Sequence, residues 1–559
     1  MTKTTMRAGV AAAVSVLALT LASCGSDSSG GSGAAPVQIK FDGDYNEKAW
    51  EDVRQGGTLT LAIGDIAEQQ NPDHGDATGD TSSLAGWYLP QVTLMDGKGT
   101  VRANPDYLTG MKDEVKDGKT VVTYDIRPEA AFNDGTPIDW QAFETTWKAL
   151  NGSNPDYIVS ATDGFEAIES VVRGENDKQV VVTYNREFPW WFNQFSSVLH
   201  PALRDPEVFN KGFLSKLPDQ WGAGPYKVGT ADFQGGTVTF VPNEKWWGPK
   251  GRLDTVTFRQ MESQASLNAF KAGEIDATGV ADKERLAAAR QMGDKVEIRT
   301  SMRTANVLLT LNSKAPLLKD VQVRKGIMTG IDRSQMAAIQ FNGLDYTEKL
   351  PGSFVMFQFQ DGYKDIFGDL VSFNPDEARK ILDDAGWTVG GDGVREKDGQ
   401  KLSLKYVLVG DDQGSKALAT ALQKMLKDIG VDLQVQSRPS SDFAKILETK
   451  DFDVFASAFN SGSPDGVAYF GQVYASDSTL NNSGTGTPEL DRKIAELQKL
   501  PTAKEQIEKS HELEKEGLST YGIMPWANGP AMSAVKPGLA NIGPAAFASV
   551  AKENIGWEK

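Results

Sequence analysis

The chain has 559 residues, with 58 Lys and Arg against 75 Asp and Glu, which gives a formal net charge of −17 at pH 7. This acidic balance argues against nucleic acid as a partner and against electrostatic binding to anionic lipid headgroups. Cys24 is the single cysteine, so no internal disulfide can form. Stability must come from packed cores, and the length allows two or three domains.

The first residues of the chain predict export. Lys3 and Arg7 precede an almost continuously apolar run over residues 10–22, which is the pattern of a secretory signal peptide. A helix over this run would rise about 20 Å. The hydrocarbon core of a bilayer is about 30 Å thick, so the run is too short for a lasting membrane span.

Residues 21–24, Leu-Ala-Ser-Cys, resemble the lipobox of bacterial lipoproteins. The resemblance implies that residues 1–23 are a lipoprotein signal peptide and that Cys24 becomes lipidated after cleavage. Two acyl chains on this residue would anchor the exported protein to the outer face of the cell membrane. Residues 24–35, rich in Gly and Ser, are expected to form a flexible tether. A plain export signal with an incidental cysteine and a buried thiol are the alternatives.

The body of the chain alternates between strand and helix patterns, without an internal repeat. The β-rich runs predict strands at 57–63, 120–126, 179–184 and 305–311. Asp139 is expected to be a helix N-cap. The residues after it place an apolar stripe at helical spacing, formed by Phe143, Trp147 and Leu150.

The clearest helix signals lie in the second half of the chain. Asn374 is an expected N-cap, Pro375 suits the first helical position, and Gly386 ends the helix. A further helix is predicted from about Lys416 to Ile429, followed by alternating apolar residues that predict a strand. Helix, glycine and strand in this succession indicate an α/β domain.

Six motifs, in order along the chain, resemble those of the family 5 extracellular solute-binding proteins. These proteins are the receptors of bacterial ABC importers for dipeptides, oligopeptides and, in some members, nickel. The segments that carry the resemblance are Tyr124–Ile138, Gly222–Lys227, Asn243–Gly248, Phe270–Asp276, Val323–Arg333 and Phe373–Trp387. The resemblance extends from about residue 56 to 540.

The resemblance implies an α/β fold like that of periplasmic binding proteins, class II, cluster C. Two lobes would enclose the ligand by hinge motion, and an extra domain would be inserted in the first. The implied segments are 36–90, 218–304 and 521–559 for lobe I, 91–217 for inserted domain II, and 305–520 for lobe III. Such proteins bind solutes and are not enzymes. The implied partners are a peptide or peptide-like solute and the ABC permease subunits, with the receptor itself a monomer.

A strand is expected over 453–459, and the polar turn 460–466 after it is expected at the ligand cleft, because ligands bind beyond the carboxyl ends of strands. In peptide-binding relatives, an aspartate four residues before a proline of this loop pairs with the peptide's ammonium group. With Pro464 as that proline, the matching residue is Asn460, which brings no charge. Either Asp465 takes over this role, or the ligand presents no free amine here.

Several other residues complete the expected ligand site. Phe459 and Ser461 flank Asn460, and Trp247 and Trp526 are expected to line an apolar part of the pocket. Core packing is the alternative for both tryptophans. Asp465 also has a second interpretation. If Ser463 caps a helix that begins at Pro464, the carboxylate only complements the helix dipole.

The alternatives to a peptide receptor have weaker support. The three histidines, His74, His200 and His511, show no metal-binding spacing, so no metal and no cofactor are expected. His74 lies among carboxylates in what is expected to be a solvated loop, which leaves nickel as a minor option. A haem complex or an oligosaccharide also remains possible as ligand. A secreted hydrolase has the least support, because no nucleophile elbow or phosphate-binding loop is present.

Overall fold

The structure, a computed structural model, describes residues 39–559. The predicted lipid-attachment residue Cys24, the signal peptide and the tether therefore lie outside the described residues. Among the described residues, none of the helices combines the length and the apolar character that a membrane span requires. These residues belong to a single compact unit.

The largest sheet has seven strands in the order β12-β21-β11-β1-β10-β9-β8. Its members are β1 (Thr58–Ile63), β8 (Tyr226–Asp232), β9 (Thr237–Pro242), β10 (Thr255–Gln260), β11 (Ala277–Gly279), β12 (Glu297–Met302) and β21 (Pro530–Val535). Strand β1 pairs in parallel with β10, whereas β21 pairs antiparallel with both β11 and β12. The sheet thus collects strands from three separate stretches of the chain.

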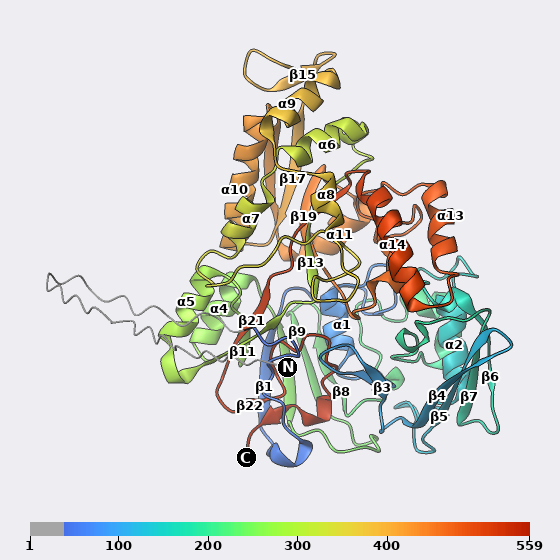
Figure 1. Cartoon of the computed structure of the whole chain (residues 1–559). Coiled ribbons are helices and arrows are strands. Elements are labelled where there is room, and N and C mark those ends of the chain that lie inside the picture. Colours follow the sequence, from blue (N-terminus) through green and yellow to red (C-terminus); the bar gives the residue numbers. More distant parts are fainter. Residues whose placement is uncertain (1–38) are drawn as a thin grey trace, which may run out of the picture. The chain divides into compact units, whose positions relative to one another are not determined.

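A second sheet has five strands in the order β18-β17-β19-β13-β20. They are β13 (Ala305–Leu311), β17 (Ser403–Val409), β18 (Asp432–Arg438), β19 (Val454–Asn460) and β20 (Ile523–Ala527). Helices α7 (Arg333–Gln340) and α10 (Gln413–Asp428) pack together beside this sheet (Figure 1). Helices α6 (Val321–Thr329) and α9 (Pro375–Asp384) also pack on each other. Parallel pairing of β17 with β18 through α10 confirms the predicted α/β arrangement.

A third sheet, of four strands in the order β4-β5-β7-β6, is packed against α2 (Trp140–Leu150). Its strands are β4 (Leu108–Lys116), β5 (Lys119–Ile126), β6 (Ile168–Arg173) and β7 (Gln179–Tyr184). Three small sheets comprise β2 (Thr93–Met95) with β3 (Val101–Ala103), β14 (Thr388–Val389) with β15 (Arg395–Lys397) and β16 (Gln400–Lys401), and β22 (Leu539–Ala540) with β23 (Gly556–Trp557).

The remaining helices lie around these sheets. They are α1 (Gly79–Ala85), α3 (Pro206–Lys211), α4 (Ser263–Lys271), α5 (Lys283–Gln291), α8 (Ile366–Leu370), α11 (Phe443–Thr449), α12 (Phe470–Tyr474), α13 (Pro488–Leu497) and α14 (Ala503–Leu518). Helix α14 packs against α8 and α13. These contacts bring the end of the chain's last long helix close to the loop that precedes α8.

The helix caps predicted from the sequence are confirmed. The Asp139 side chain accepts a hydrogen bond from the Gln141 amide at the start of α2, and Asn374 caps α9. Gly386 follows α9 with a φ of +85°, which suits glycine at a helix end. Helix α10 begins at Gln413, earlier than predicted, because the Asp412 carboxylate accepts a hydrogen bond from the Ser415 amide and caps it.

Two chain crossings connect the seven-stranded sheet with the five-stranded sheet. Arg303 and Thr304 join β12 to β13, and Asn528 and Gly529 join β20 to β21. Strand β20 pairs with β13, although residues from 521 onward were expected in lobe I. Both β20 and β21 are apolar strands. The composition therefore does not change where the chain passes from one sheet to the other, and the boundary could not be predicted from it.

Candidate functional site

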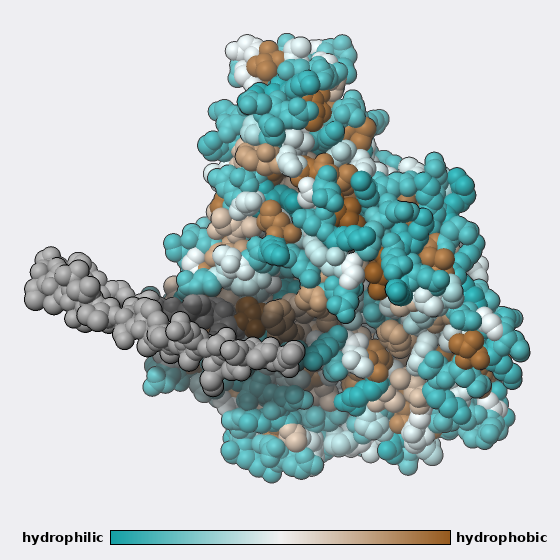
Figure 2. Space-filling view, viewed as in Figure 1, coloured by the Kyte–Doolittle hydropathy of each residue, from teal (hydrophilic) through white to brown (hydrophobic). Residues whose placement is uncertain are grey.

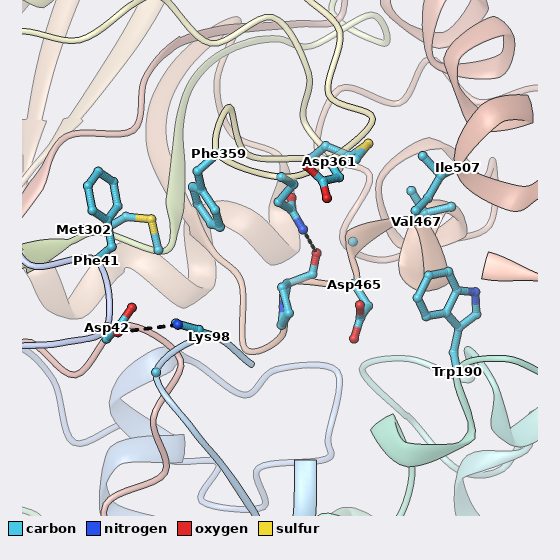
Figure 3. A pocket seen from close by; sticks show the side chains of 15 residues that line it. Phe41, Asp42, Lys98, Trp190, Met302, Phe359, Asp361, Asp465, Val467 and Ile507 are labelled. Atoms are coloured by element: carbon cyan, nitrogen blue, oxygen red, sulfur yellow. Dashed lines mark hydrogen bonds and ion pairs between the residues drawn. The ribbon is translucent and has the colours of Figure 1, made fainter. Parts of the chain in front are cut away.

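A cavity of about 440 Å³ lies where loops from all three larger sheets meet (Figure 3). Its walls combine segments that are far apart in the sequence. They comprise Phe41, Asp42, Gly97, Lys98, Trp190, Met302, Met356, Phe359, Gln360, Asp361, Pro464, Asp465, Gly466, Val467 and Ile507. Met302 ends β12 of the seven-stranded sheet, and residues 464–467 follow β19 of the five-stranded sheet. Both sheets therefore contribute to this pocket.

The rim of the pocket exposes apolar side chains to solvent. Phe41 is 62% exposed and Phe359 is 46% exposed. Elsewhere on the face that Figure 2 shows, hydrophilic residues predominate and apolar ones form small separate patches. Exposed aromatic rings beside a recess are typical of ligand sites, because burying them on binding is favourable.

Asp465 supplies a carboxylate to the pocket, as Figure 3 shows. Its Oδ2 lies 3.0 Å from the Ser463 hydroxyl and accepts a hydrogen bond of 3.4 Å from the Asn193 amide. Burial raises the pKa of this carboxyl, and the two hydrogen bonds oppose that shift. The partly enclosed carboxylate is thus suited to pair with a cationic group of a ligand.

The helix after Asp465 begins later than the sequence suggests. A single 3₁₀ turn covers Gly466–Tyr469, with Asp465 as its N-cap residue but without a capping hydrogen bond from that side chain. The Ser463 hydroxyl accepts a hydrogen bond of 3.1 Å from the Asp465 amide. The carboxylate therefore faces the Asn193 side and is not used to cap the helix.

The pocket is closed on one side by contact between two loops. Gly99, in the turn between β2 and β3, has a φ of +93°, and a Cβ placed there would lie 2.3 Å from Pro464 Cγ. Only glycine allows this approach. Gln360 also donates a hydrogen bond of 2.5 Å to the Pro464 carbonyl. Pro464 is thus held between neighbours from two other parts of the chain.

The loop between α7 and α8, residues 341–365, forms another wall of the pocket. The fully buried Glu514 carboxylate of α14 holds it by accepting hydrogen bonds from the Phe354 amide at 2.6 Å and the Ser353 hydroxyl at 2.8 Å. The Val355 amide and the Tyr474 hydroxyl also point at this carboxylate. Three donors from residues 353–355 therefore fix the loop segment that precedes Met356 and Phe359, and Tyr474 of α12 supplies a fourth to the same carboxylate.

The four-stranded sheet's region touches α14 beside the pocket. The Trp190 indole N–H donates a hydrogen bond of 2.8 Å to Gln506 Oε1 in the protein interior. Arg186 donates to the Gln498 carbonyl at 3.1 Å. These contacts position Trp190 as one wall of the cavity (Figure 3).

Three of the predicted ligand residues lie at the end of β19, outside the pocket lining. Asn460 is exposed and pairs in the ladder with Ala305. The Ser461 amide donates to the Thr304 carbonyl at 2.7 Å. The Phe459 ring packs edge-on against Phe354 at 5.0 Å. Of the predicted β19-loop residues, only Asp465 lines the cavity, and the roles of the others stay predictions.

The two predicted tryptophans lie in packed surroundings. Trp247 donates its indole N–H to the Asp106 carbonyl at 2.6 Å, and its ring packs against that of Trp246 at a tilt of 42°, with 4.5 Å between the ring centroids. Trp526 is 1% exposed on β20, and its indole N–H has no hydrogen-bond acceptor among residues 39–559. Neither ring lines the cavity, so a ligand role for them stays a prediction.

His74 is not solvated, contrary to the expectation from its polar loop. It is 3% exposed, stacks on Phe209, and accepts a hydrogen bond from the Asp76 amide at 3.1 Å. The polar residues next to His74 in the sequence predict an exposed loop, and they give no sign that its ring packs on Phe209. Within residues 39–559, no group of three His, Cys, Asp or Glu side chains is arranged to hold a metal ion.

Asp163 gives the contact between the four-stranded sheet's region and α12 a pH dependence. Burial raises its pKa to about 7, supported by Glu166 nearby and opposed by a hydrogen bond with Gln472. Because the folded pKa exceeds the ordinary value near 4, this group's contribution to stability is complete below about pH 4 and is lost as pH rises through 7.

The melting temperature of the Asp163→Asn protein is therefore expected to rise relative to that of the parent protein as pH increases. The asparagine cannot ionise, so the difference should be several degrees more positive at pH 8 than at pH 5. Thermal unfolding at both pH values measures it, with the exposed Asp177→Asn as the matched control. An equal difference at the two pH values would show that Asp163 is ionised throughout.

Comparison with known proteins decides the family. Residues 103–481 match the family described as bacterial extracellular solute-binding proteins, family 5 Middle. Oligopeptide-binding protein OppA of Mycobacterium tuberculosis is 31% identical over 528 residues, which covers 92% of this chain and 87% of that protein. The chain belongs to family 5. It is thus a solute-binding protein of the ABC-importer type, a non-catalytic receptor, and the hydrolase alternative is set aside.

Solved structures show the same fold. The periplasmic EDTA-binding protein EppA matches with a TM-score of 0.77 at 22% identity, over 94% of this chain and all of that chain. Oligopeptide-binding protein AppA of Bacillus subtilis, in complex with a nonapeptide, matches with a TM-score of 0.75 at 19% identity, over 91% and 100%. The predicted cluster C periplasmic-binding fold is confirmed.

Some pocket residues of this family 5 chain were not predicted from the sequence. The α7–α8 loop, residues 341–365, holds Met356, Phe359 and Gln360. Its length without regular structure, combined with the apolar run Phe354–Phe359, was a usable signal, because long loops in compact domains are usually functional. Phe41 and Lys98 had no such signal, whereas the Trp190–Trp191 pair was among the tryptophans that could line an apolar pocket.

Proposed function

We propose that this chain is the substrate-binding lipoprotein of an ABC importer that captures peptides or peptide-like solutes and delivers them to a membrane permease. The observation that carries the proposal is the similarity to an oligopeptide-binding protein over nine-tenths of the chain. The segments expected as lobe I, domain II and lobe III each contribute to the pocket walls, which supports capture by closure around the two chain crossings.

The chemistry of the pocket suits a peptide. Apolar rings and methionine side chains can accommodate varied side chains, since Met adapts its shape to its neighbours. Asp465 offers a negative group for the peptide's ammonium, the role that Asn460 cannot fill with charge. The cavity of about 440 Å³ lies within the usual range for small-ligand sites, about 300–1,000 Å³.

Melting curves with a pentapeptide library test the proposal. A ligand that binds the folded state raises the melting temperature, by an amount that grows with its concentration over Kd. We expect a rise with the library and none with free amino acids of the same composition. A rise with nickel–histidine or iron–EDTA chelates but not with peptides would instead favour the chelate alternative.

Asp465→Asn is expected to weaken binding of peptides with a free amino terminus about ten-fold. A hydrogen bond to a charged group is worth about 1.5–3 kcal/mol, against about 1 kcal/mol for a neutral pair. Titration calorimetry measures the change. N-acetylated peptides should bind both proteins equally, and Asp361→Asn, which removes a carboxylate from the same pocket, is the matched control. Unchanged affinity for free peptides would remove Asp465 from ammonium binding.

A further inference from the structure

Residues 40–44, the edge segment, lie along the outer edge of the seven-stranded sheet. The Lys40 amide donates to the Thr300 carbonyl, and the Lys40 carbonyl accepts from the Met302 amide, both at 3.3 Å, in parallel pairing with β12. The Asp44 carboxylate accepts a hydrogen bond of 2.8 Å from the Thr300 amide. The edge segment is therefore held at both of its ends.

A glycine in another loop allows the edge segment to pass close to the cavity. A Cβ on Gly97, in the turn between β2 and β3, would overlap the carbonyl oxygen of Asp42. The Lys98 ammonium lies 3.9 Å from the Asp42 carboxylate as an ion pair (Figure 3). Phe41 and Asp42 both line the cavity. The edge segment is thus a fixed wall of the pocket.

Phe41 places an exposed ring on this wall. Within the described part of the chain, the exposed phenylalanines are Phe41, Phe359 and Phe373, and the first two line the same cavity. Phe41 is carried by the seven-stranded sheet through β12. Phe359 belongs to the 341–365 loop, which the Asn306 side chain of β13 holds by a hydrogen bond of 2.9 Å. The two rings therefore come from different sheets.

The recess beside these rings suits an aromatic side chain. Figure 3 shows Phe41 and Met302 next to each other, with Phe359 turned toward the same space. Aromatic rings attract one another in edge-to-face or offset arrangements, and methionine sulfur makes favourable contacts with ring edges. Covering exposed rings also removes apolar surface from water, which favours binding.

We propose that Phe41 and Phe359 enclose an aromatic side chain of the captured solute, so that the edge segment helps to determine specificity. This inference rests on the proposed function and deepens it, because it names peptides with an aromatic side chain as the preferred substrates. Hinge closure then brings the two rings onto that side chain. The edge segment lies outside residues 103–481, over which the chain matches the family, so family membership alone does not supply this wall.

The test uses three pentapeptide libraries built from Ala, Gly and Ser, of which one carries a single Phe, one a single Lys and one neither. By titration calorimetry, the parent protein should bind the Phe library at least ten-fold more tightly than the plain library. Phe41→Ala should remove most of this preference without changing affinity for the plain library, and Phe41→Leu should retain part of it. Phe373→Ala, which removes an exposed ring away from the cavity, is the matched control and should behave as the parent.

The outcomes separate this inference from the proposed function. Equal affinity of the parent for the Phe and plain libraries, or a full preference in Phe41→Ala, would overturn the aromatic role and leave the peptide receptor standing. An equal loss for all libraries in Phe41→Ala would show that the ring only supports the fold. Tightest binding of the Lys library would assign the recess to the nearby Asp361 carboxylate instead. Failure to bind any library would overturn both proposals, and the comparison in the parent needs no variant.

Discussion

Replacing Glu514 by alanine is expected to lower the free energy of unfolding by about 3 kcal/mol and to abolish high-affinity ligand binding. The substitution leaves the Phe354 and Val355 amides and the Ser353 hydroxyl without their buried acceptor. Each unsatisfied buried donor costs about 1–3 kcal/mol. The freed loop carries Met356 and Phe359, so the pocket wall loses its position.

Denaturant unfolding and titration with the pentapeptide library measure the two effects of Glu514→Ala. Glu514→Gln retains one acceptor oxygen, so it should lose less free energy of unfolding and less ligand affinity than Glu514→Ala. Glu512→Ala, on the exposed side of α14, is the matched control and should leave both unchanged. Parent-like affinity in a destabilised Glu514→Ala protein would show that the loop holds its position without this carboxylate.

Replacing Cys24 by alanine is expected to move the protein from the membrane fraction to the soluble fraction of its own cells. The proposed diacylglyceryl group contributes about 0.8 kcal/mol for each buried CH₂, and removing it removes the anchor. Cell fractionation with immunoblotting measures the change, and Ser26→Ala is the control that should remain membrane-bound. Peptide affinity should be the same in all three proteins, since the anchor is remote from the pocket in the sequence. Membrane retention of the Cys24→Ala protein would contradict lipid anchoring.

Much of the fold was predictable because local signals agreed. Asn374, Pro375 and Gly386 together bound α9, and the β-rich runs at 179–184 and 305–311 are strands β7 and β13 with those bounds. The family motifs then supplied the arrangement that no local pattern carries. Strand β20 shows the limit: an apolar strand fits either sheet, and only pairing with β13 decides.

The candidate site was less predictable, because pockets are assembled by tertiary contacts. The strand before this loop was predictable from its pattern, and the loop after β19 supplies Asp465 to the cavity. Lys98 and Trp190 enter from distant segments without a shared pattern.

We propose above all that this receptor captures peptides intact. Native mass spectrometry of the protein purified from its own cells, before and after gentle release of its ligand, tests this directly. We expect one bound peptide-sized ligand for each protein molecule, with a mass unchanged after long incubation with the protein. A metal chelate or sugar as the bound mass, or an empty protein that ignores the pentapeptide library, would contradict it.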